Sequence, residues 1–136
     1  MVELFHSTSE KCSRIVTEGY STFFFSAIGM LHTSLRKPVY NIYGFVRFAD
    51  EIVDSFHDFD KKLLLQQFKV ETYDAIERKI SLNPILNSFQ QTVNEYGIDA
   101  KLIDSFFESM EMDLEKTKYD SQGYQEYIYG SAEVVG

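Results

Sequence analysis

The chain has 136 residues, enough for one domain that buries roughly two thirds of the surface its unfolded form exposes. Its formal net charge of −8 argues against nucleic acid as a partner, because phosphate backbones are bound by clustered Lys and Arg. A single cysteine, Cys12, cannot form an intrachain disulfide, and no run approaches the roughly 18 apolar residues of a membrane span.

These features also give an expectation for location. Residues 1–11 carry acids and no long apolar core, which is not the pattern of a secretory signal peptide. One free thiol is typical of a reducing compartment. We therefore expect a cytoplasmic protein, and peripheral contact with a membrane is compatible with this expectation.

The chain contains two Pro and seven Gly, and so few interruptions favour long helices and an all-α fold. We expect a first helix within residues 1–19, with Ser9 as its N-cap. Residues 20–32 carry a continuous apolar run that fits a short helix or a buried strand equally well. Residues 33–37 are then expected to form a turn.

A long central helix is predicted next. Pro38 fits its first turn, where the missing N–H costs nothing, and the helix is expected to end near residues 58–60. Three later helices each begin with a capping side chain, and these caps are Asp60, Asn83 and Asp99. Gly97 closes the second of them. The sequence thus predicts six or seven helices and no strand hairpin.

The central helix carries a polar stripe. Residues 36–58 read RKPVYNIYGFVRFADEIVDSFHD, and helical winding places four polar side chains in one stripe about 60° wide. The stripe consists of Tyr43, Arg47, Asp50 and Asp54. Most of the remaining circumference is apolar, and a helix that is apolar on nearly every side is normally buried.

Asp50 and Asp54 lie one helical turn apart, with Cβ atoms about 5–6 Å from each other. They can act together on one ligand, but they ionise together with difficulty unless a cation is near. Mg²⁺ fits such a pair, because it takes one or two carboxylates and completes its shell with water and phosphate oxygens. The alternative, which geometry alone favours, is a solvated helix face on which Arg47 pairs with Glu51.

The segment YGFVRFADEIVD, residues 43–54, resembles the first aspartate-rich motif of the squalene/phytoene synthase family. Three more segments resemble landmarks of that family in the right order, namely YSTFFFSAI at 20–28, MEMDL at 110–114 and YIYGSAEVVG at 127–136. The resemblance implies an isoprenoid synthase-type helical bundle around a central cavity. No second aspartate-rich motif follows, so we expect residues 1–136 to be the N-terminal part of one such all-α domain.

The resemblance also implies roles for particular residues. Asp50 and Asp54 would hold Mg²⁺, Arg47 would contact diphosphate, and Tyr43 would lie beside the ionising carbon or hydrogen-bond the phosphate. The implied substrate-binding residues, besides Arg47, are Ser21, Phe24, Tyr127, Val134 and Val135.

Two positions depart from the family pattern, and a third matches it. Phe23 stands where the family commonly has a serine, and Glu133 stands where it usually has a glycine. Asp113 matches an acid that recurs in the family, but a surface position with Lys116 or Lys118 nearby is the simpler explanation.

The activity implied is the head-to-head condensation of two prenyl diphosphates, farnesyl or geranylgeranyl, to squalene, dehydrosqualene or phytoene, with diphosphate released. The resemblance leaves the use of NADPH open. We expect the chain alone to be inactive and to associate with the missing half or with itself. A non-catalytic helical protein such as an assembly factor is the alternative, and a terpene cyclase is a weaker one.

Overall fold

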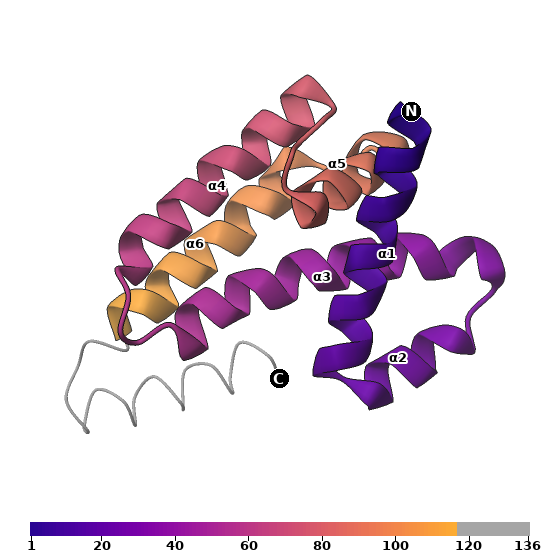
Figure 1. Cartoon of the computed structure of the whole chain (residues 1–136). Coiled ribbons are helices and arrows are strands. Elements are labelled where there is room, and N and C mark those ends of the chain that lie inside the picture. The colour runs from indigo at the N-terminus through magenta and orange to yellow at the C-terminus, as the bar shows by residue number, and fades with distance from the viewer. Residues whose placement is uncertain (117–136) are drawn as a thin grey trace.

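The computed structural model describes residues 1–116, and these form six α-helices and no strand (Figure 1). The helices are α1 (Val2–Tyr20), α2 (Thr22–Gly29), α3 (Thr33–Ser55), α4 (Lys61–Arg78), α5 (Pro84–Tyr96) and α6 (Ala100–Lys116). The all-α prediction is confirmed. Within these residues, no helix combines the length and the apolarity that crossing a membrane requires.

Helix α3 is the centre of this arrangement, because it contacts every other described helix. In Figure 1, α1 crosses the half of α3 that begins at Thr33, with α2 below it. Helices α4 and α6 lie side by side along the other half of α3, and α5 packs against α1, α3 and α4. The long central helix predicted from the sequence, which carries the polar stripe, is therefore the one around which the others pack.

The core is built from aromatic rings that meet on α3. Phe45 of α3 stacks on Phe89 of α5 with ring centroids 3.8 Å apart, and on Phe68 of α4 at 5.3 Å. Phe107 of α6 meets the same ring edge-on at 5.8 Å. All four rings are buried, and each such pair adds about 0.5–1.5 kcal/mol beyond its apolar area. Phe45 thus joins four helices at one point.

Helix α1 is attached through small polar side chains, which we call the polar seam. Ser9, Ser13 and Thr17 recur every fourth residue and are fully buried. The Ser13 hydroxyl pairs with that of Ser88 on α5, and Asn87 Nδ2 donates to Ser9 Oγ at 3.1 Å. Buried polar groups are tolerated when they are hydrogen-bonded, and their small size lets the helices approach closely.

Gly44 allows the same close approach between α1 and α3. It is buried, and a Cβ atom added there would lie 3.1 Å from Ser13 Oγ and 3.3 Å from Ser13 Cα. A side chain at this position would force the two backbones apart.

Two expectations about the beginnings of helices were wrong. Helix α1 begins at Val2, so Ser9 is not its N-cap but lies inside it and donates to the Phe5 carbonyl at 2.9 Å. Residues 33–37 are not a turn but the first turns of α3, where His32 Nδ1 accepts from the Ser34 N–H at 3.2 Å. Pro38 consequently lies inside the helix.

The end of α3 also differs from the prediction. The helix stops at Ser55, and Phe56 leaves it with φ −85° and ψ 51°. Lys61 Nζ reaches back to the Val53 carbonyl at 2.5 Å and satisfies an acceptor that the helix end leaves open. The end of α3 is thus stabilised by Lys61, eight residues after Val53, and the residues at the helix end carry no capping signal of their own.

The predicted caps of the later helices are confirmed. Asp60 accepts from the Leu63 N–H at 3.1 Å, Asn83 accepts from Ile85 and Leu86, and Asp99 accepts from Lys101 at 2.9 Å. Gly97 closes α5 with φ +63°, a left-handed conformation that glycine adopts without steric cost. The ambiguous stretch at 20–32 is helical over Thr22–Gly29, with Ser21 as its N-cap.

Candidate functional site

The candidate site lies on the face of α3 that carries the predicted stripe. Arg47 Nη1 is 3.9 Å from Asp50 Oδ2, and the charge of Asp54 acts on both of these groups. Tyr43 lies one turn before Arg47, beside α2. The structure therefore brings Arg47, Asp50 and Asp54 together, and Tyr43 lies one turn away from Arg47 on the same helix.

The two stripe acids differ in their surroundings. The Asp50 side chain is 35% exposed, whereas Asp54 is exposed. Burial raises the pKa of the Asp50 carboxyl, the charge of Asp54 raises it further, and Arg47 offsets only part of this. The prediction that this helix is buried therefore holds in part at Asp50 but not at Asp54, which lies one residue before the end of α3.

Helix α6 brings another acid toward this pair. Asp113 is half-buried, and burial raises the pKa of its carboxyl, with Lys116 opposing the shift and the charge of Asp54 adding to it. The charge of Asp113 in turn helps to raise the pKa of Asp50. The simpler explanation offered from sequence, a surface acid beside Lys116, therefore misses its electrostatic coupling to α3. The MEMDL segment was the signal that could have found it.

The acids do not form a complete protein cage for a metal. Among residues 1–116, no group of three or more His, Cys, Asp or Glu side chains converges closely enough to hold a metal ion. What α3 offers is a pair of carboxylates, which is the number that Mg²⁺ commonly takes from a protein.

Arg47 is held between a carboxylate and an aromatic ring. Its Nη2 donates to Glu51 Oε2 at 2.7 Å, and its guanidinium lies 4.8 Å from the centre of the Tyr20 ring. Burial alone lowers the pKa of Arg47, but the hydrogen bond and charge of Glu51, with Asp50 and Asp54, outweigh it and raise the pKa. Its Nε is buried and lacks a hydrogen-bond partner within the described residues.

The alternative drawn from sequence is confirmed for one pair. Arg47 does pair with Glu51, and this hydrogen bond is the main reason that the pKa of Glu51 is lowered. The pairing does not extend to Asp54, which has no ion pair in the part of the chain that the structure describes. Arg47 of the stripe is therefore paired with Glu51 beside it, whereas Asp54 has no cationic partner among the described residues.

Aromatic and hydroxyl groups of α2 adjoin the stripe. The Phe24 ring stacks on Tyr43 with centroids 4.8 Å apart and an interplanar angle of 24°. Ser21 Oγ accepts from the Phe24 N–H at 3.0 Å. This N-cap fixes the first turn of α2, which carries the Phe24 ring. Ser21 keeps its own O–H available as a donor. Phe23, the residue before Phe24, is 83% exposed.

A cavity of about 360 Å³ opens beside the Arg47–Glu51 pair. Its wall includes Tyr20, Phe48, Glu51 and Phe56, so it is mostly aromatic with one carboxylate. An apolar hollow with a few polar groups is the usual form of a small-molecule site.

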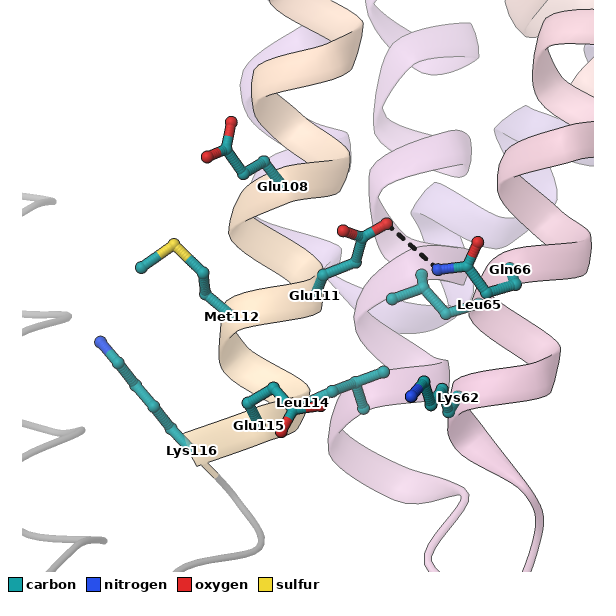
Figure 2. A pocket seen from close by; sticks show the side chains of 9 residues that line it. All are labelled: Lys62, Leu65, Gln66, Glu108, Glu111, Met112, Leu114, Glu115 and Lys116. Carbon is teal, nitrogen blue, oxygen red and sulfur yellow. Dashed lines mark hydrogen bonds between the residues drawn. The ribbon is translucent and has the colours of Figure 1, made fainter.

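A second cavity, of about 460 Å³, lies between α4 and α6 and contains none of the predicted site residues (Figure 2). Glu111 of α6 points toward α4, where it accepts from Gln66 Nε2 at 3.2 Å and from Lys69 Nζ at 3.0 Å. The wall of this cavity carries both lysines and glutamates, so it favours neither an anion nor a cation. The predicted residues Tyr127, Val134 and Val135, together with Glu133, lie outside the described residues.

Comparison with known proteins gives a match to one family over most of the chain. A family model described as squalene/phytoene synthase matches residues 17–136. A presqualene diphosphate synthase of Rhodopseudomonas palustris (strain ATCC BAA-98 / CGA009) is 27% identical over 93 residues, which are 68% of this chain and 33% of that protein. The match therefore spans about a third of the relative's length. No solved structure matches the chain to a significant degree.

Proposed function

This chain belongs to the squalene/phytoene synthase family, and on that premise we propose that it takes part in the head-to-head condensation of two prenyl diphosphates with release of diphosphate. The observation that carries the proposal is the grouping of Arg47, Asp50 and Asp54 on α3. Arg47, a side chain suited to binding anions, lies there beside Asp50 and Asp54, two acids that repel each other. Membership of this family supports a prenyltransferase.

The acid pair suits Mg²⁺. In residues 1–116, Arg47 is the one Lys or Arg side chain within ion-pair distance of Asp50, at 3.9 Å, and none lies that close to Asp54. Burial and, after it, the charge of Asp54 raise the pKa of Asp50, and a bound divalent ion would relieve the repulsion between the two acids. When bound, Mg²⁺ would neutralise charge on diphosphate and so make it a better leaving group.

The other side chains supply binding and shielding. The N–H groups of Arg47 that Glu51 does not use can donate to diphosphate oxygens, and Arg is suited to phosphate because its donors form a planar fork. Ser21 adds a hydroxyl donor near the start of α2. The stacked rings of Phe24 and Tyr43 offer π faces that attract a carbocation and exclude water that would quench it.

A non-catalytic member of the family, such as an assembly factor, is the second candidate. It is favoured by the engagement of Arg47 with Glu51 and by the exposure of Asp54, since neither feature requires a ligand. A second aspartate-rich helix encoded by the same gene would favour catalysis over the non-catalytic candidate.

The direct test uses the protein as its gene encodes it, incubated with labelled farnesyl or geranylgeranyl diphosphate and Mg²⁺. We expect condensed products that disappear with EDTA and whose chain length identifies the substrate; parallel reactions with and without NADPH test whether it is used. Replacing Asp54 by Ala should lower turnover by about 100-fold or more while helicity is retained, because the residue is exposed.

The matched control is Glu77→Ala, which removes an exposed acid from α4 and should leave turnover unchanged. Near-normal turnover of the Asp54→Ala variant would remove Asp54 from the site. Absence of product from the unmodified protein with either substrate would favour the non-catalytic candidate.

A further inference from the structure

A basic pocket of about 520 Å³ lies between α1, α2 and α3, on a part of the molecule that the candidate site does not use. We propose that this basic pocket binds a ligand through a phosphate group. Its charged wall consists of Lys11 and Arg14 from α1, Arg36 and Lys37 from α3, and one acid, Glu10. Phe25 and Tyr40 supply an aromatic part of the wall.

The charge of this wall runs against that of the chain. Four cations and one acid give it a formal charge of +3, whereas the whole chain carries −8. Lys37 pairs with Glu10 at 3.2 Å. Within residues 1–116, Lys11, Arg14 and Arg36 make no ion pair. Unpaired cations held around one hollow repel each other, and a bound anion relieves that repulsion.

Both arginines are already fixed by other contacts. The Arg14 guanidinium lies over two rings, 5.6 Å from the centre of Phe25 and 5.8 Å from that of Tyr40. Arg36 Nε donates to the Leu31 carbonyl at 3.0 Å. Neither contact uses the terminal Nη groups of Arg36, and stacking leaves the edge of the Arg14 guanidinium free to donate. Such preorganisation reduces the entropy lost when a ligand binds.

The chemistry of the wall specifies a phosphate rather than a carboxylate. Two guanidinium groups and two ammonium groups with a net charge of +3 match an anion of more than one negative charge, and guanidinium donors bind phosphate oxygens in pairs. The cavity has the size of a typical small-molecule site and exceeds what a phosphate alone fills. The remainder, beside Phe25 and Tyr40, suits an apolar portion of the same ligand.

The basic pocket is separate from the acidic stripe. Arg36 precedes Asp50 by fourteen residues on the same helix, which at 1.5 Å per residue places them about 20 Å apart along the axis. Binding here therefore does not depend on the proposed activity. The phosphate can come from a free phosphorylated compound or from the headgroup of an anionic lipid, and the experiment separates these sources.

The test uses the whole chain in EDTA, so that Mg²⁺-dependent binding at α3 is absent. Inorganic pyrophosphate is titrated by calorimetry, and sedimentation is measured with phosphatidylcholine vesicles that contain or lack phosphatidic acid. We expect saturable binding that Lys11→Gln/Arg36→Gln weakens by about tenfold or more. Pyrophosphate binding without vesicle binding identifies a free compound, and sedimentation with phosphatidic acid identifies a headgroup; both results support the pocket.

Two matched variants make the result specific. Arg78→Gln/Lys101→Gln removes the same charges from exposed positions on α4 and α6, and Asp50→Asn/Asp54→Asn alters the acidic stripe. Both should bind as the unmodified chain does. The single variant Lys11→Glu, at an exposed residue, repeats the test if the double variant fails to fold. No binding to either probe, or equal weakening by Arg78→Gln/Lys101→Gln, would overturn the proposal.

Discussion

Arg47 donates to Glu51 across 2.7 Å, one helical turn farther along α3. The two side chains are 22% and 21% exposed, so the pair is screened from solvent more than a fully exposed ion pair is. We expect the double-mutant cycle of Arg47→Ala and Glu51→Ala to give a coupling free energy of about 0.5–1 kcal/mol toward folding.

The measurement is urea unfolding of the four proteins in the cycle. The Lys69–Glu111 pair, at 3.0 Å and with side chains 34% and 35% exposed, is the matched control and should couple more weakly. A coupling near zero for Arg47 and Glu51 would mean that the hydrogen bond merely replaces one with water.

Replacing Asp50 by Asn should stabilise the fold at neutral pH. The pKa of Asp50 is raised by burial and by Asp54, so its ionised form is less favourable in the folded protein than in the unfolded chain. The sign follows from linkage: the folded state binds the proton more tightly, so stability falls as pH rises through the folded pKa. The gain from Asn should therefore be present at neutral pH and vanish well below the ordinary carboxyl pKa.

Unfolding by urea at the two pH values checks this, with Glu77→Gln as an exposed control that should change little at either. If Asp50→Asn lowers stability at neutral pH, the ionised carboxylate contributes to folding and the repulsion inferred here is not the dominant effect. Turnover of the same variant should fall, so function and stability change in opposite directions.

Gly44→Ala should destabilise the protein by about 1–3 kcal/mol, because the added methyl group meets both the side chain and the backbone of Ser13. Gly19→Ala is the control. Nothing lies within 4 Å of a Cβ atom at Gly19, and alanine favours helix, so this change should stabilise by up to about 1 kcal/mol. Thermal unfolding of both variants gives the comparison. Equal effects of the two substitutions would contradict the close contact between α1 and α3.

Thr92→Val should destabilise by about 1–3 kcal/mol, because it removes the acceptor for a buried amide. Asn41 Nδ2 donates to Thr92 Oγ1 at 3.0 Å, and Asn41 Oδ1 already lacks a partner within the described residues. Asn41→Leu in the same protein removes the amide as well, so the double variant should recover most of the stability. A double variant as unstable as the sum of the single changes would show that packing, not the lost acceptor, sets the cost.

Sequence predicted the parts of this fold that depend on neighbouring residues. The caps Asp60 and Asn83 act on N–H groups two or three positions away, so their residue types suffice. Ser9 has the same capping preference, yet its place is set by Asn87 of α5, seventy-eight residues away. The proximity of Asp113 to the acids of α3 was missed for the same reason, because it depends on how α6 packs.

The polar seam also limits how α1 can slide along its neighbours. Its hydroxyl side chains recur every fourth residue, so a displacement by four residues, about 6 Å, would again face hydroxyls toward α5. Such a displacement would carry Thr17 to the place opposite Gly44 that Ser13 now fills with little space to spare. Since threonine is the larger residue, this one glycine on α3 disfavours that displacement, although the hydrogen bonding would be comparable.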